Sequence, residues 1–148
     1  MGNSKLPRGL RNNNPGNIEK SGSSWKGKVP HDRNTDGRFE QFEEFEGKHG
    51  MVWGVRALTK LGWSYLKQNP NHTIKTFFEK YAPSFENDTN AYANYVAKKV
   101  GVSPDNTVMQ IYKDSSKQYL FILAIIQMEN SQAFDNQHVS DGVELGNS

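Results

Sequence analysis

The stretch YLFILAII, residues 119–126, is apolar at every position and restricts the possible folds more than any other feature. A helix that is apolar all round leaves no face for water, so it lies at the centre of a folded unit. The run is too short to cross a bilayer, and we therefore expect no membrane insertion. In a chain of 148 residues it predicts a buried helix over residues 115–129 of a single domain.

The segments around this run predict further helices. Apolar residues recur at helical spacing over residues 49–68, 74–81 and 88–100, and Gly101 can end the last of these. Two glycines, Gly54 and Gly62, share one face of the first helix, where they predict a close neighbour. Ser103-Pro104 predicts the start of a short helix to about residue 111, and residues 138–146 add a last turn or two.

Residues 1–47 differ in composition: they are rich in Gly, Asn and Ser, and their apolar residues are few and scattered. This composition predicts loops and two or three short strands. We therefore expect one α+β domain over residues 1–148 that is mainly α-helical. It would comprise a β-rich lobe at about 12–47 and a helical lobe at about 48–146.

Glu129 is the acid that best suits catalysis, because it ends the apolar helix. The helix dipole places partial negative charge there, and apolar walls exclude water. Both effects would raise the pKa of the carboxyl group, and a carboxylic acid protonated near neutral pH can act as a general acid. The alternative is that the chain reaches solvent here and the side chain points outward. Glu40 and Glu86 are weaker candidates, since a solvated face or a helix cap explains them as well.

Several other chemistries are excluded by composition and spacing. The chain has no cysteine, and its four histidines show no metal-binding spacing, so we expect no metal and no cofactor. The net charge of +2 is concentrated in a basic N-terminal third, which can favour an anionic polymer or be an ordinary surface. No basic helix face is present, and we expect no nucleic-acid partner.

Three segments carry a resemblance to a known group of enzymes: RGLRNNNPGNI (residues 8–18), KYAPSFENDTNAYANYVAKKV (80–100) and AIIQMENS (124–131). Together they resemble the lysozyme-like superfamily of peptidoglycan-cleaving enzymes, in particular glucosaminidases and lytic transglycosylases. The first segment also resembles the start of small phage and prophage proteins described as virion structural proteins or cell-wall hydrolases. The resemblance implies a lysozyme-like fold.

One departure from that family concerns the order of the segments. In lysozyme-like enzymes the helix with the catalytic Glu precedes the asparagine motif, whereas only about ten residues precede Asn12 here. The buried helix and its Glu129 stand at the other end of the sequence. We hypothesise a circularly permuted domain, in which Glu129 and Asn12–Asn14 share one cleft.

The resemblance implies cleavage of β-1,4 glycosidic bonds in peptidoglycan, by a lytic transglycosylase or a muramidase. Glu129 would be the general acid and base, with Glu86 or Glu40 as a second carboxylate if two are needed. Substrate-binding roles fall to side chains that can bond N-acetyl groups, stack on sugars or pair with carboxylates: Asn12, Asn13, Asn14, Asn17, Trp25, Tyr92, Tyr95 and Arg11. Trp25 can instead pack the lobe, and Arg11 can be a surface charge.

The expected partners are peptidoglycan glycan strands and other virion proteins. The N-terminus has no apolar stretch that could serve as a signal peptide. We therefore expect the protein in a phage virion, or in the host cytoplasm with delivery to the periplasm or cell wall. The alternative function is that of a non-catalytic virion structural or glycan-binding protein with the same fold.

Overall fold

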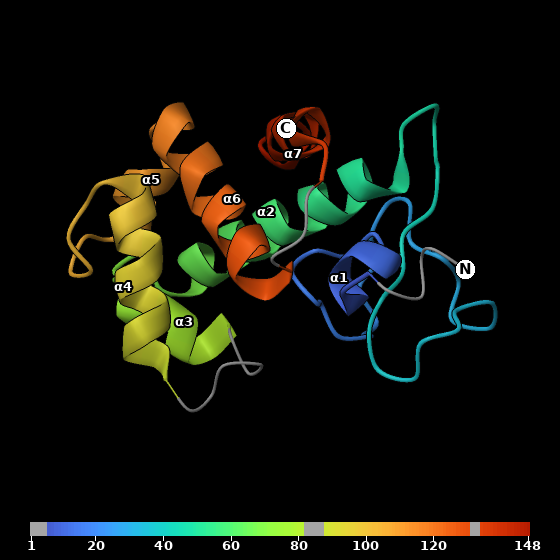
Figure 1. Ribbon diagram of the computed structural model, residues 1–148, viewed down its shortest axis with the longest axis horizontal. Helices are drawn as coiled ribbons and strands as arrows, with labels where there is room; N and C mark the ends of the chain where they lie inside the picture. The colour runs from blue at the N-terminus through green and yellow to red at the C-terminus, as the bar shows by residue number, and fades with distance from the viewer. Residues whose placement is uncertain (1–5, 82–87, 131–133) are drawn as a thin grey trace. The chain divides into compact units, whose positions relative to one another are not determined.

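The computed structural model describes residues 6–81, 88–130 and 134–148, and these form a mainly helical fold, as predicted (Figure 1). The chain divides into two compact units. The discontinuous unit comprises Met1–Lys60 and Glu129–Ser148, and the continuous unit comprises Leu61–Met128. The boundaries between the units lie within helices α2 (Gly50–Gln68) and α6 (Ser115–Asn130).

The other helices are α1 (Arg8–Arg11), α3 (Ile74–Tyr81), α4 (Thr89–Val100), α5 (Val108–Tyr112) and α7 (Asn136–Gly146). Three differences from the sequence prediction stand out. Helix α1 was expected to be a loop, and α7 is longer than the predicted turn or two. Helix α5 begins at Val108 instead of Ser103-Pro104, because Thr107 caps it by accepting a hydrogen bond from the Gln110 N–H.

The continuous unit has an apolar, aromatic core. Helices α3 and α4 pack together, and the Phe78 ring is stacked on Tyr92 at 4.4 Å between centroids and on Phe121 at 5.7 Å. Asp88 caps α4 by accepting from the Ala91 N–H. Helix α6 is largely buried, as predicted, but one side reaches water, since Leu120 is 37% exposed.

The discontinuous unit opens with α1 and with a turn over residues 12–17, NNNPGN, which we call the asparagine turn. Pro7 begins α1, and its carbonyl accepts the N–H groups of Leu10 and Arg11. After that single turn, Asn13 and Asn17 both have left-handed backbones, with φ of 52° and 51°. Asparagine tolerates this conformation better than most residues, which explains part of the asparagine run.

Close helix packing joins α7 to the first half of α2 within the discontinuous unit. Gly142 lies against Val52 and Val55, and Gly146 lies against Arg56 and Thr59. These contacts advance in the same direction along both helices. A larger residue at Gly142 would collide with the α2 backbone, since the Val52 carbonyl oxygen is within reach of a Cβ atom.

The glycines inside α2 admit neighbours, as predicted. Gly54 contacts the Asn13 carbonyl oxygen, and Gly62, in the continuous unit, contacts the Tyr112 hydroxyl group. In this way α2 receives the asparagine turn directly against its backbone.

The segment expected to be a β-rich lobe pairs at single positions. Isolated antiparallel bridges join Glu19 to Phe39, Lys28 to Phe42 and Phe45 to Lys48. Within the described residues these bridges do not extend into a sheet, and a β-rich lobe is not confirmed. Side-chain bonds, described below, hold much of this segment instead.

Candidate functional site

The carboxyl group of Glu129 lies in the discontinuous unit, in contact with the asparagine turn. Asn17 Nδ2 donates a hydrogen bond of 3.2 Å to Glu129 Oε1, across 112 positions of sequence. Glu129 is partly buried, and its carboxyl group contacts the protein through this hydrogen bond. The structure thus brings together two residues that the sequence analysis selected separately.

A second contact fixes the turn to the end of α6. The buried side chain of Asn130 donates from Nδ2 to the Pro15 carbonyl oxygen at 2.9 Å. Gly9 of α1 lies against the same side chain, where a Cβ atom would collide with it. The turn is therefore held in place beside Glu129 by the neighbouring residue of the same helix.

Asn17 carries an unusual polar atom. Its Oδ1 is buried and accepts no hydrogen bond from the described residues, while Nδ2 is engaged with Glu129. A buried acceptor without a donor is costly, so its presence calls for an explanation, and a functional role is one. Asn17 is the asparagine of the turn whose side chain faces the candidate acid.

Asn12 and Asn14 were expected to bind substrate, and in the structure their side-chain amides bond other parts of the protein. Asn14 is fully buried and donates to the carbonyl oxygens of Ile18 and Glu40, while its Oδ1 accepts from the Ile18 N–H. Asn12 is 5% exposed and bonds Asp36 and Gln41. Both build the turn, because an amide can satisfy backbone groups that no strand partner reaches.

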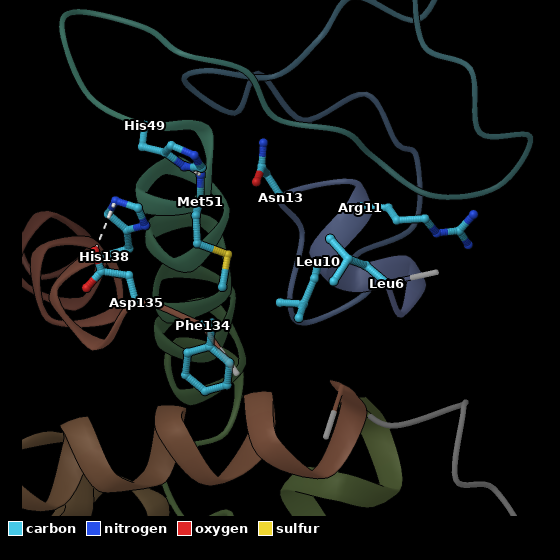
Figure 2. A pocket seen from close by; sticks show the side chains of 9 residues that line it. All are labelled: Leu6, Leu10, Arg11, Asn13, His49, Met51, Phe134, Asp135 and His138. Atoms are coloured by element: carbon cyan, nitrogen blue, oxygen red, sulfur yellow. Dashed lines mark hydrogen bonds and ion pairs between the residues drawn. The ribbon is translucent and has the colours of Figure 1, made fainter. Parts of the chain in front are cut away.

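Asn13 faces a pocket of about 360 Å³ in the discontinuous unit (Figure 2). Met51, His49 and Phe134 lie on one side of this pocket, and Leu10 and Asn13 lie opposite them. Asn13 Nδ2 donates to the Phe42 carbonyl oxygen at 3.0 Å, and its Oδ1 accepts nothing from the described residues. The pocket combines apolar walls with a polar edge, which is typical of small-ligand sites.

Two histidines form part of that edge. The rings of His49 and His138 are stacked with 4.4 Å between centroids, and His138 Nε2 is 3.8 Å from the Asp135 carboxylate (Figure 2). His49 Nδ1 accepts the Met51 N–H at the start of α2, so the neutral ring carries its proton on Nε2. Glu129 is not among the residues that line this pocket; the turn connects the two, with Asn13 at the pocket and Asn17 at the acid.

Glu40 was expected on a solvated face or in a first helical turn, and it is fully buried instead. His31 Nε2 lies 3.0 Å from its Oε1, Lys28 Nζ lies 3.8 Å from Oε2, and the Ser21 N–H donates to Oε2. These partners lie in loops, so no local sequence pattern predicts the burial of Glu40. The other fallback acid, Glu86, lies outside the described residues.

The remaining predicted binding residues are dispersed. Trp25 is partly exposed, with a buried Nε1 that donates to no described residue. Tyr92 is fully buried in the core of the continuous unit, so it does not present a surface to a glycan, contrary to expectation. Tyr95, in the same unit, is partly exposed, and Lys99 Nζ lies 5.5 Å from its ring centroid. Arg11 is exposed and lines the pocket of Figure 2.

A comparison of sequences places the chain among phage proteins. It is 34% identical to protein P5 of Pseudoalteromonas phage PM2 over 144 residues, which is 94% of this chain and 81% of P5. The chain belongs to the P5 family. This relative confirms the phage affinity predicted from the N-terminal motif, although the name P5 states no activity. No protein-family model matches the chain.

The sequence analysis missed the histidine pair of this P5-family chain. His138, Gly142 and Gly146 recur every four residues along α7 and so share one face. The two glycines on this face indicate that the helix packs closely on another. Its partner helix could not be named from the sequence. Among the described residues, no group of three or more His, Cys, Asp or Glu side chains could hold a metal ion, and no helix is long and apolar enough to cross a membrane.

Proposed function

We propose that this protein cleaves the β-1,4 glycosidic bonds of peptidoglycan glycan strands, with Glu129 as general acid and base. The proposal rests above all on the hydrogen bond between Glu129 and Asn17. This bond joins the acid at the end of a largely buried helix to the asparagine turn. The lysozyme-like resemblance implies that this turn binds substrate. The fold proposed with it is a circularly permuted lysozyme-like domain with a small β-rich lobe.

A single-acid reaction suits this arrangement. Protonated Glu129 gives its proton to the glycosidic oxygen as the bond from that oxygen to C1 of the muramic acid breaks. The 6-hydroxyl oxygen of the same sugar then attacks C1, and its proton passes to the Glu129 carboxylate. The sugar ends in a 1,6-anhydro ring, and the acid is restored for the next cycle.

Asn17 positions the acid in this scheme. Its Nδ2–H donates to Oε1, a contact that suits the ionised carboxylate. An amide also offers an acceptor, so a rotation of the Asn17 side chain presents Oδ1 to the protonated form of Glu129. A partner of this kind accommodates both protonation states that the reaction requires of one residue.

The pocket of Figure 2 is the proposed sugar subsite. Leu10, Met51 and Phe134 supply apolar walls for the C–H faces of a sugar ring. Asn13 Oδ1 can accept an N–H from an N-acetyl group, since the described residues leave this oxygen unused.

Lysis of purified cell walls tests the proposal. The wild type is expected to reduce the turbidity of a peptidoglycan suspension, and Glu129→Gln is expected to lower the rate by a factor of about 100 or more. Glu144→Gln serves as the matched control, because Glu144 is an exposed acid of the same unit. Equal lysis by Glu129→Gln, at an unchanged melting temperature, would refute the assignment. Mass spectrometry of the products separates an anhydro end, left by a transglycosylase, from the reducing end left by a muramidase.

The second candidate is a non-catalytic virion structural or glycan-binding protein. It is favoured by the internal use of Asn12 and Asn14, which makes the turn a structural device. Membership of a phage protein family suits a place in the virion, beside other virion proteins, or in the host cytoplasm before delivery to the cell wall. Sedimentation with cell walls, without release of soluble fragments, is the result expected of this candidate.

A further inference from the structure

A second hollow in the discontinuous unit is lined by arginines. It measures about 430 Å³, and Arg8, Arg11 and Arg38 line it together with Thr35, Asp36 and Phe39. Arg8 and Arg11 come from the single turn of α1, whereas Arg38 follows a loop some thirty residues later. Three guanidinium groups at one hollow repel one another, and carboxylates of the protein or a bound anion offset this repulsion.

Two of the three arginines, Arg8 and Arg38, are held against one ring. The Cζ atoms of Arg8 and Arg38 lie 4.9 Å and 5.0 Å from the centroid of the buried Phe39 ring. Asp36 Oδ1 accepts the N–H groups of Arg38 and Phe39, so the loop itself is fixed. Groups held in this way lose little freedom on binding, which favours affinity.

The balance of charge favours a ligand with one negative charge. Asp36 Oδ2 lies 3.9 Å from Arg8, and Glu19 lies 3.2 Å from Arg38, so two of the three positive charges are compensated. Arg11 has no ion pair with a described residue. The Thr35 hydroxyl accepts from Gln41 Nε2, and its own O–H remains able to donate.

We propose that this hollow binds the free carboxylate of a peptide, with Arg11 as the principal cation and Thr35 as a second donor. A guanidinium group meets a carboxylate through two parallel hydrogen bonds. A dianionic phosphate would be repelled by Asp36 within the same hollow. The ligand class is therefore a peptide that ends in a carboxylate.

The position of Arg11 connects this hollow with the candidate sugar site, because Arg11 lines both pockets. In Figure 2 its side chain extends away from Leu10 and Asn13. A glycan strand that carries short peptides offers a sugar to one pocket and a carboxylate to the other. This choice of source rests on the function proposed above, whereas carboxylate binding itself does not.

Titration of the ¹⁵N-labelled protein with N-acetyl-D-alanine tests the proposal. The amide signals of Gly37 and Arg38 are expected to shift, with a Kd of roughly millimolar size for so small a probe. N-acetyl-D-alaninamide, which lacks the charge, and inorganic phosphate are expected to bind at least several-fold more weakly. Equal binding of the amide, or tighter binding of phosphate, would overturn the proposal.

Arg11→Ala is expected to weaken binding of the probe by about tenfold. Arg33→Ala is the matched control, because Arg33 is exposed, pairs with Glu43 and lies outside the hollow. An unchanged affinity in Arg11→Ala would contradict the assigned role of this residue. Failure of the two proposals can be distinguished: a protein that binds the probe but leaves cell walls intact disproves only the glycosidase, and the reverse result disproves only the carboxylate site.

Discussion

The two units of this protein are stabilised by different means. The continuous unit buries aromatic and aliphatic side chains, among them Phe78, Tyr92 and Phe121. The discontinuous unit buries Asn12, Asn14, Glu40 and Asn130 beside its apolar residues, and each has polar contacts with other parts of that unit. Apolar packing is tolerant of detail, whereas a buried polar group needs its own partner in place. The unit that carries the candidate sites is therefore the one that depends on individual contacts.

The largest effect is expected in the continuous unit. Phe121→Ala would remove a fully buried ring that contacts Phe77 and Phe78, at a cost of about 3–5 kcal/mol in the free energy of unfolding. Urea denaturation followed by far-UV circular dichroism measures this loss. Leu120→Ala, one position earlier and exposed, should cost less than about 1 kcal/mol. Equal losses would show that packing does not dominate there.

The matching test in the discontinuous unit is Asn14→Ala. It would leave the Ile18 and Glu40 carbonyl oxygens without this donor inside the protein, at a cost of roughly 2–4 kcal/mol. Asn94→Ala, on the exposed side of α4, should be neutral or slightly stabilising, because alanine is the better helix former. Thermal unfolding measures the stability of both variants. A neutral Asn14→Ala would show that the discontinuous unit does not depend on this buried polar group.

Gly54→Ala examines the close approach of the turn to α2. Alanine favours a helix by about 1 kcal/mol, yet the added methyl group would overlap the Asn13 carbonyl oxygen. Overpacking costs about 1–3 kcal/mol, so we expect a net loss near 1 kcal/mol and displacement of the turn. Gly22→Ala, where a Cβ atom meets nothing within 4 Å, is the control for stability. A gain in stability for Gly54→Ala would contradict the observed contact.

The smallest effect concerns pH and the arginine hollow. Burial acts to raise the pKa of Asp36, but hydrogen bonds from the Arg38 and Phe39 N–H groups and from Asn12, with the charge of Arg8, outweigh it, and the pKa is lowered. A carboxylate with a lowered pKa stabilises the fold above its unfolded value of 3.8, and this contribution disappears as the pH falls through the lower folded value.

Asp36→Asn should therefore be less stable than the wild type at pH 7, by less than about 1 kcal/mol for the loss of its partly exposed ion pair with Arg8. The difference should shrink below about pH 4. Chemical denaturation at pH 7 and pH 3 measures it, with Asp32→Asn, an exposed neighbour, as control. A difference that grows as the pH falls would have the wrong sign for this account.

The sequence predicted best what local physics decides. The helices over 50–68, 74–81, 89–100 and 115–130 follow from apolar spacing and from caps such as Asp88, which lie close to the residues they serve. Helix α1 was missed because a single turn after Pro7 has no periodicity. The start of α5 was misplaced because Ser103-Pro104 and Thr107 offer competing caps, and the structure uses Thr107.

The sequence indicated which segments form the candidate site, but it did not predict the role of each residue. The asparagine run and Glu129 were singled out separately, and their contact through Asn17 is in the structure. Which asparagine builds the turn and which faces the acid depends on long-range partners such as Glu40 and Phe42, and no spacing reveals them. The burial of Glu40 and the stacking of His49 on His138 were missed for the same reason.

The division of one unit between the two ends of the sequence has a consequence for synthesis. The discontinuous unit needs Met1–Lys60 and Glu129–Ser148 together, so it cannot be completed before the later segment has been synthesised. Until then, the α2 surface that receives Gly142 and Gly146 remains uncovered. Glu129, the partner of Asn17, arrives on that same late segment. The candidate acid site can therefore form only after both of its segments have been synthesised.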